Sequence, residues 1–228
     1  MNKIEVKDKK SFNVDKDSIF VINNNSNSNY NFNVTCNGKV FIYVTRSCTI
    51  NFDIDSNLDL NIFSFDTSLV INLNLNKDNI LLKYGYSTFN NNDNKYIVNI
   101  YHNSTNQEAN IINHGLNNTS NRLDFIVNSY VYKESTNVIT NQNNKIIIKE
   151  DNNSSIKPNL LIDNEEIEAS HSAYLGSFKK DDIFYLLTRG LNYDEVIKLL
   201  SRSFLMGNLN IGYKEKNIIL DKIDMYWR

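Results

Sequence analysis

Short runs of β-branched and aromatic residues recur along most of this chain, and their alternation constrains the fold more than any other feature. In the run at 68–75, apolar residues occupy positions 69, 71, 73 and 75, whereas Asn72 and Asn74 stand between them. A period of two is that of a β-strand with one buried face, so the odd positions should face inward. Such runs lie at 18–22, 31–36, 39–45, 48–54, 58–65, 68–75, 79–86, 96–102, 109–114, 122–132, 137–140 and 145–149.

Strands at a regular spacing of about 10 to 12 residues, with no helix between them, are typical of a sandwich, a barrel or a β-solenoid. The connections are rich in Asn, which tolerates the left-handed conformation at the corners of stacked coils. The two-residue hairpin signal Asn-Gly occurs only at Asn37-Gly38. These features favour a solenoid, although the strand pattern by itself fits a sandwich equally well.

Asparagine dominates the composition, with 42 residues against one proline and seven glycines. This balance excludes collagen-like, proline-rich and glycine-linker proteins. Because Asn, Ile and Lys share AT-rich codons, we interpret the bias as genomic drift. Many of the asparagines should therefore be passive surface residues.

The pattern changes after about Lys157. Pro158 should open a final strand, followed by an acidic stretch at 164–178. Helical periodicity then predicts one helix from Asp181 that stops at Gly190, a second begun by the capping-box pair Asn192 and Glu195, and a third over 213–226. The sequence thus predicts a β core over residues 1–157 and a unit over 158–228 that holds the last strand and a small helical region.

Charge excludes several classes of partner. The 24 Lys and Arg residues are balanced by 26 Asp and Glu residues along the whole chain, so no basic stretch is available to neutralise the phosphates of a nucleic acid. The N-terminus is polar and mixed in charge, and no apolar run approaches the roughly 18 to 20 residues of a membrane span. We expect a cytoplasmic protein that binds neither nucleic acid nor membrane.

Few residues are suited to catalysis or metal binding. Cys36 and Cys48 are too few for a disulfide framework or a four-ligand zinc site, and we interpret them as passive thiols. His102 and His114 should lie at the surface or in loops. Asp53 and Asp55 share a strand face by period two. They could be paired carboxylates of a β-helical carbohydrate-active enzyme, although solvated surface aspartates explain them more simply.

One region carries a specific signal. It comprises EASHSAYLG from Glu168 to Gly176, DDIFYLLTRGL from Asp181, and DEVIKLL ending at Leu200, followed by Ser203-Phe204. These segments resemble the C-terminal signature of the SufB/SufD family of iron–sulfur cluster assembly proteins. Weaker matches precede them in the same order: a possible counterpart at His114, then QNNKIII from Gln142, PNLLI at 158–162 and EI at 166–167.

The resemblance implies a right-handed parallel β-helix with a small C-terminal helical unit. SufB-type members carry Cys-Asp-Ser where this chain reads Asn143-Asn144-Lys145, and a Glu where it has Ser172. The chain therefore looks SufD-like. In the family, the histidine matching His171 lies at the SufB–SufD interface where the nascent cluster is thought to form, and imidazole is a suitable iron ligand. We expect His171 in a turn between the last strand and the helices, where capping that turn is its simpler role.

The resemblance also implies a function. The chain would be a non-catalytic scaffold that pairs with a SufB-like subunit, or with a second copy of itself, and docks a SufC-like ATPase. It would hold no cofactor stably when alone, with a transient iron–sulfur cluster at the partner interface. A carbohydrate-active enzyme and a structural β-solenoid without a partner remain alternatives. The expected docking residues for the ATPase are Phe184, Tyr185, Arg189, Gly190, Leu199 and Phe204, while Ile183, Leu186, Val196 and Leu200 should pack internally.

Overall fold

The computed structural model describes residues 2–6, 9–23, 27–149 and 152–226. In these residues fifteen strands form two parallel sheets, and three helices follow them in sequence. The odd-numbered strands make one sheet, in the order β1 to β15, and the even-numbered strands make the other, in the order β2 to β14. The strands are β1 (Asn2–Val6), β2 (Ser11–Val14), β3 (Ser18–Ile22), β4 (Ser28–Val34), β5 (Gly38–Val44), β6 (Cys48–Ile54), β7 (Leu58–Phe65), β8 (Leu69–Leu75), β9 (Leu81–Asn90), β10 (Asn94–His102), β11 (Glu108–Asn117), β12 (Leu123–Val131), β13 (Val138–Ile148), β14 (Ser155–Ile162) and β15 (Ile167–Gly176).

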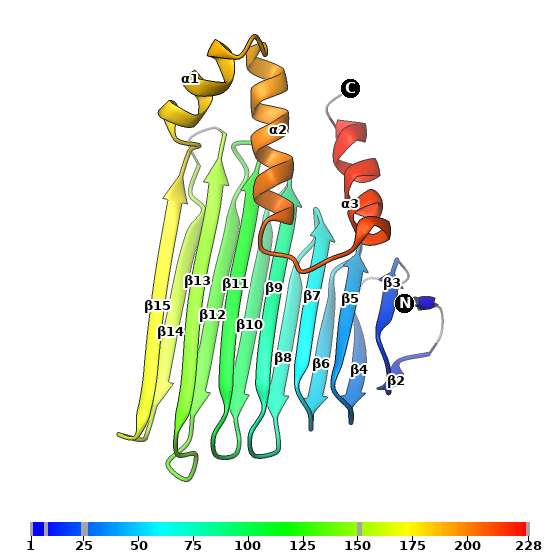
Figure 1. Ribbon diagram of the computed structural model, residues 1–228, viewed down its shortest axis with the longest axis vertical. Helices are drawn as coiled ribbons and strands as arrows, with labels where there is room; N and C mark the ends of the chain where they lie inside the picture. Colours follow the sequence, from blue (N-terminus) through cyan, green and yellow to red (C-terminus); the bar gives the residue numbers. More distant parts are fainter. Residues whose placement is uncertain (1, 7–8, 24–26, 150–151, 227–228) are drawn as a thin grey trace.

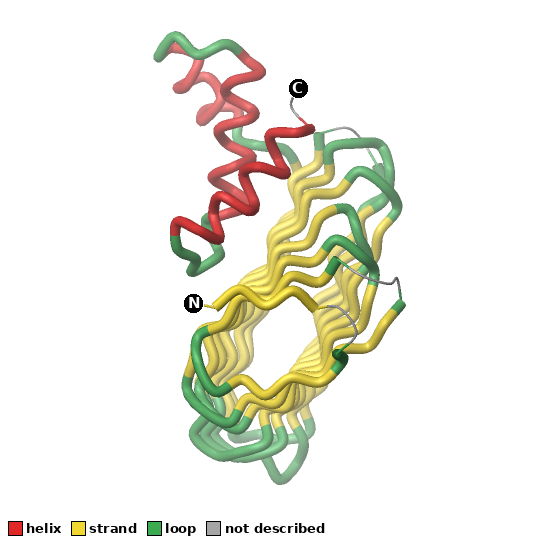
Figure 2. Tube along the Cα trace, turned by 90° about the vertical axis from the view of Figure 1, so that its right-hand side faces the viewer, coloured by secondary structure: helices red, strands yellow, loops and turns green. Residues whose placement is uncertain are grey.

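The chain alternates between the two sheets, so each rung of the coil contributes one strand to each sheet. Figure 2 looks along the coil and shows the two sheets closing around a common interior. This is a parallel β-helix, as expected from the sequence. Even strands such as β8 bury every second residue, from Leu69 to Leu75, so the predicted inward face of this run is confirmed.

The interior is filled by side chains stacked from rung to rung. Phe12, Phe32 and Phe52 occupy equivalent positions on β2, β4 and β6, with ring centroids 5.1 and 4.9 Å apart. Parallel strands in register place identical positions directly above one another, about 4.8 Å apart, so like residues stack. Stacked apolar residues therefore form a core between parallel strands.

The asparagines are not passive. On the outward face of the even sheet, each Asn of a row after the first donates its side-chain amide to the side-chain carbonyl of the Asn one rung before it, with N–O distances of 2.7 to 2.8 Å. Four other asparagines have positive φ angles at corners, as the solenoid interpretation predicts. The expectation of inert surface residues is wrong because the parallel register turns repeated Asn into hydrogen-bonded ladders. The row comprises Asn31, Asn51, Asn72, Asn99, Asn128 and Asn159.

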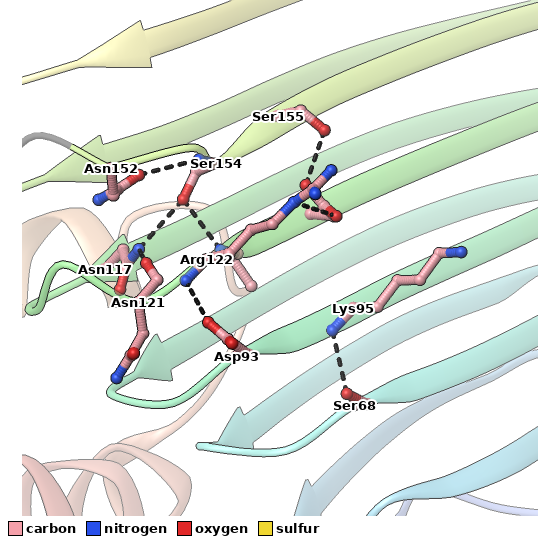
Figure 3. A network of polar contacts seen from close by, with 11 residues as sticks. Ser68, Asp93, Lys95, Asn117, Asn121, Arg122, Asn152, Ser154 and Ser155 are labelled. Carbon is pink, nitrogen blue, oxygen red and sulfur yellow. Dashed lines mark hydrogen bonds and ion pairs between the residues drawn. The ribbon is translucent and has the colours of Figure 1, made fainter.

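Side chains also join neighbouring rungs at the corners (Figure 3). The Ser154 hydroxyl accepts hydrogen bonds from the Asn117 side chain at 3.1 Å and from the Leu123 backbone at 2.9 Å. One rung below, the Asp93 carboxylate accepts the backbone N–H of Arg122 at 2.7 Å. Short polar side chains thus satisfy backbone groups that a corner would otherwise leave unpaired.

Several boundaries differ from the prediction. The runs at 137–140 and 145–149 form one strand, β13, because the polar residues between them continue the alternation. Strands β1 and β2 precede the first expected run. Pro158 lies within β14, at the edge of its sheet where its missing N–H is tolerated, and β15 follows it. The strands continue to Gly176, because β15 follows the last strand that the sequence predicts.

The three helices are α1 (Lys180–Thr188), α2 (Tyr193–Met206) and α3 (Tyr213–Tyr226). The capping box of Asn192 and Glu195 is present, and Gly190 ends the first helical segment with a φ angle of 91°. In Figure 1 α2 and α3 lie in front of the odd sheet, whereas α1 lies beyond the upper ends of β13 and β15. Residues such as Ile19, Phe41 and Phe63 pack with Leu205 and Ile219 there. The odd strands β3 and β5 are therefore buried on both faces.

The connection between α2 and α3 lies directly on the odd sheet. The Asn208 amide donates to the carbonyls of Tyr86 and Ile112 at 2.7 and 3.1 Å, and Ser87 donates to its Oδ1 at 2.7 Å. A Cβ atom at Gly85 would lie 2.5 Å from the Asn208 carbonyl oxygen. Glycine at this position is what allows the connection to approach the strand so closely.

Candidate functional site

The two ends of the β-helix differ in how well their inner faces are covered. At the N-terminal end, Val6, Phe12 and Val14 of the first strands have only 1%, 7% and 1% of their surface exposed. At the opposite end the inward residues of β14 and β15 are half-buried or exposed, and Leu175 has 43% exposed. The C-terminal end is therefore open, and it presents apolar side chains that a partner could cover.

The backbone at this open end is also unpaired. Strand β14 neighbours only β12, and β15 neighbours only β13, so each has one edge without a partner strand in the described part of the chain. An exposed strand edge with apolar residues is a template for pairing with another chain. Leu161 and Tyr174 have exposed fractions of 47% and 45%, but their register places them on the outward faces of these two strands.

His171 lies in the middle of this open end. It pairs in register with Gln142, whose side chain is buried inside the β-helix, so His171 stands on the inner face of β15. The expected turn is wrong: residues 167–176 form a strand, whose apolar alternation is weak because its inward positions include two alanines and His171. His171 is the one polar side chain on the inner faces of β14 and β15, whose other members are Ile156, Pro158, Leu160, Ile162, Ile167, Ala169, Ala173 and Leu175.

The two positions that separate SufB-type from SufD-type sequences lie next to each other. Asn143 on β13 pairs in register with Ser172 on β15, and both lie on the outward face. Neither side chain can act as a thiolate or carboxylate ligand. Among the described residues no group of three or more His, Cys, Asp and Glu side chains is placed to hold a metal ion.

Both cysteines lie far from the open end, near the other end of the coil. Cys48 is buried in the core, and desolvation raises the pKa of its thiol to about 12. Cys36 donates its S–H to the Val14 carbonyl at 3.6 Å. Neither is placed to be a reactive thiolate, which agrees with the passive role predicted for them.

His114 has a structural role that the sequence did not reveal. Its ring stacks on Phe204 of α2 at a centroid distance of 4.3 Å, and its Nδ1 lies 2.7 Å from the Phe204 carbonyl oxygen. Because a carbonyl only accepts, Nδ1 must carry the proton. Burial lowers the pKa of His114 to about 4, and burial also lowers that of the fully enclosed His102 to about 4. The expectation that these two histidines lie at the surface or in loops is therefore wrong, because both belong to strands and are largely buried.

The same contact bears on the docking residues. Phe204 is half-buried and packs on the odd sheet, so it faces inward. In contrast, Phe184 and Tyr185 on α1 have 69% and 56% exposed, and Leu199 on α2 has 45% exposed. The Arg189 guanidinium lies 5.0 Å from the centroid of the Tyr185 ring and donates to its hydroxyl at 3.2 Å.

Helix α1 buries none of its residues, which is unusual for a helix rich in aromatic and aliphatic side chains. Leu187 of α1 and Tyr193 of α2, which the sequence did not single out, extend the exposed apolar surface with 38% and 58% exposed. We call the surface formed by Phe184, Tyr185, Leu187, Tyr193 and Leu199 the α1–α2 face. Helical periodicity alone could not separate these residues from core residues.

Asp53 and Asp55 belong to the ladders on the even sheet. Asp53 accepts a hydrogen bond from Asn74 at 3.0 Å, and Asp55 accepts one from Asn76 at 3.4 Å. Their oxygens thus serve the rung-to-rung network, which provides no support for a pair of catalytic carboxylates.

Fold and site together define a parallel β-helix with one open end and a helical unit that exposes an apolar face. A family model described as "SUF system FeS cluster assembly, SufBD core domain" matches residues 18–204. The chain therefore belongs to the SufBD core domain family and takes part in iron–sulfur cluster assembly within SUF system complexes. No curated protein matches it in sequence. Within the described residues, no helix is long and apolar enough to cross a membrane.

Proposed function

We propose that this chain is a SufD-like, non-catalytic scaffold subunit of a SUF complex and acts in the cytosol. The observation that carries the proposal is the open end of the β-helix, where His171 is the one polar side chain on the inner faces of the last two strands. Asn143 and Ser172 support the SufD-like assignment because they lack the thiolate and carboxylate of the SufB type.

The open end would pair with a SufB-like subunit or with a second copy of this chain. Pairing would satisfy the free edges of β14 and β15 and bury the inward side chain of Leu175. His171 would then lie inside the interface, where its imidazole could bind iron of the nascent cluster. The cluster is a transient substrate of the assembled complex, and the isolated chain would hold none stably.

The α1–α2 face would dock a SufC-like ATPase. Aromatic and arginine side chains are the usual anchors of protein interfaces, and Phe184, Tyr185 and Arg189 supply them here. Because α1 buries nothing within the chain, docking would also stabilise that helix. ATP hydrolysis would belong to the partner, since this chain has no phosphate-binding loop.

Replacing His171 tests the interface. The chain is co-expressed with its native SufB-like and SufC-like partners, and iron and sulfide bound to the purified complex are measured anaerobically. His171→Ala should retain the complex and reduce cluster yield by about tenfold or more, while Ser172→Ala, on the same strand but the opposite face, should not. Equal yields from both variants, or recovery of a chain that pairs with no SUF subunit, would refute the SufD-like role.

Docking of the ATPase is tested separately. Tyr185→Ala combined with Arg189→Ala should weaken binding of the SufC-like ATPase by about 2 kcal/mol, roughly thirtyfold in Kd. Tyr213→Ala on α3 is the matched control, because Tyr213 is even more exposed, at 80%, but lies outside the α1–α2 face. Unchanged affinity for the double variant would place the docking surface elsewhere.

A further inference from the structure

Gln142 has one side-chain atom that the rest of the interior leaves unsatisfied. Its Nε2 donates to the Ser129 hydroxyl at 2.9 Å and to the Asn159 carbonyl at 3.2 Å. The Asn159 carbonyl fixes the orientation of the amide, because a backbone carbonyl only accepts and the amide nitrogen is the atom that can donate to it. The other amide atom, Oε1, is buried without a hydrogen-bond partner.

A buried amide oxygen without a donor costs about 1–3 kcal/mol, so a neighbouring group that donates to it would stabilise the fold. On the inner face of the odd sheet, the register neighbours of Gln142 are Ile111 on β11 and His171 on β15. Ile111 is apolar. Thr140, two residues away on β13, already donates to Ser129 at 3.0 Å. His171 is the neighbour that brings an N–H group.

We propose that Gln142 is a positioning residue for His171. A rotation of the imidazole would let Oε1, which has no hydrogen-bond partner in this structure, accept the hydrogen of one ring nitrogen of His171, and the other nitrogen, with its lone pair, would face out of the open end. Register neighbours on parallel strands stand about 4.8 Å apart, which places the imidazole within reach of the amide. The arrangement fixes one tautomer of the ring, as hydrogen bonds to ligating histidines commonly do.

This inference rests on the proposed function for its purpose, because the exposed nitrogen would be the one offered to iron. It gives the buried residue Gln142 of β13 a role in the chemistry of the interface. Without this hydrogen bond, the buried Oε1 atom would lower the stability of the fold, because it would have lost its hydrogen bonds to water. Ser129 and Asn159 hold the amide and thereby support His171 indirectly.

The tautomer of His171 tests the proposal on the isolated full chain. Two-bond ¹H–¹⁵N correlation spectra are recorded at about pH 8, where an imidazole is neutral. The chain has three histidines, so His171→Ala identifies the signals. His114 is an internal reference, because its Nδ1 must carry the proton that faces the Phe204 carbonyl. We expect one His171 tautomer to dominate by about tenfold, the effect of one hydrogen bond.

Three variants complete the test. Gln142→Met keeps the volume without an acceptor and should return His171 to the tautomer ratio of a peptide of the same local sequence. Gln142→Glu keeps an acceptor and should retain the dominant tautomer. Thr140→Val disturbs the same Ser129 cluster but is in register with Ala169, so it should have no effect.

Comparable amounts of the two His171 tautomers in the native chain would overturn the proposal. This measurement does not depend on whether any variant folds. A dominant tautomer that survives Gln142→Met, or that Thr140→Val abolishes equally, also overturns it.

Cluster yield separates the inference about Gln142 from the proposed function of the chain. If Gln142 controls the tautomer but His171→Ala leaves the cluster yield of the complex unchanged, the proposed function fails and the inference stands. If His171→Ala abolishes the cluster while Gln142→Met leaves the tautomer unchanged, the inference fails alone.

Discussion

Asn143 and Ser172 are register partners on adjacent strands, with their side chains on the same outward face. They lie 29 positions apart in the sequence, yet the parallel pairing of β13 and β15 makes them neighbours. The two positions that distinguish the SufB type from the SufD type are thus one location in space. A thiol and a carboxylate there would form a local pair, whereas this chain has an amide and a hydroxyl.

The isolated chain should therefore assemble no stable cluster. Anaerobic reconstitution with iron and sulfide should leave the visible spectrum of the desalted protein featureless, because no group of three suitable ligands exists in its described residues. The combined change Asn143→Cys and Ser172→Glu should increase retained iron over the native chain. A stoichiometric cluster on the native chain would contradict the scaffold role.

Gly85 should be essential for seating the α2–α3 connection. Gly85→Ala places a methyl group 2.5 Å from the Asn208 carbonyl oxygen, so either β9 or the connection must shift. We expect the free energy of unfolding to fall by about 1–3 kcal/mol in a urea titration. Gly38→Ala is the control, because the nearest atom to its added Cβ lies 3.7 Å away. Equal free energies of unfolding for the two variants would contradict the close contact between Gly85 and the Asn208 carbonyl.

The asparagine ladder should stabilise the coil in proportion to the bonds removed. Asn99 both donates to Asn72 and accepts from Asn128, whereas Asn31 only accepts from Asn51. Asn99→Ala should lower the free energy of unfolding by about 1–2 kcal/mol and Asn31→Ala by under about 1 kcal/mol, since both sites are partly solvated. Thermal unfolding followed by circular dichroism gives the comparison. A larger loss at Asn31 would contradict the ladder interpretation.

Stability should decrease as the pH falls from about 6.5 to about 4. Burial lowers the pKa of His114 to about 4 in the fold, and Lys145 beside it acts in the same direction. The unfolded chain therefore binds a proton in this window that the native chain does not, which favours unfolding by on the order of 3 kcal/mol at the lower limit. His114→Gln should reduce the slope of unfolding free energy against pH. His102, whose pKa burial also lowers, should supply the slope that remains.

Local sequence patterns predict the strands from β3 to β14 and the three helices. Alternation in β8 and the capping box at Asn192 are local signals, because each depends on neighbours a few residues away. The motif around His171 likewise identified the family, since a signature depends on the order of residues along the chain. The choice between solenoid and sandwich required more, because both satisfy the same period of two.

Only the tertiary structure decided which residues meet across rungs. The asparagine ladders, the His171–Gln142 register and the contact of His114 with Phe204 join residues 20 to 90 positions apart. Helical periodicity does not show which surface a helical residue packs against, so the sequence could not separate the half-buried Phe204 from the exposed Phe184. Strand β15 was missed for the complementary reason. As the last strand of an open coil it buries neither face, and its alternation is weak because Ala169, His171 and Ala173 occupy the middle inward positions.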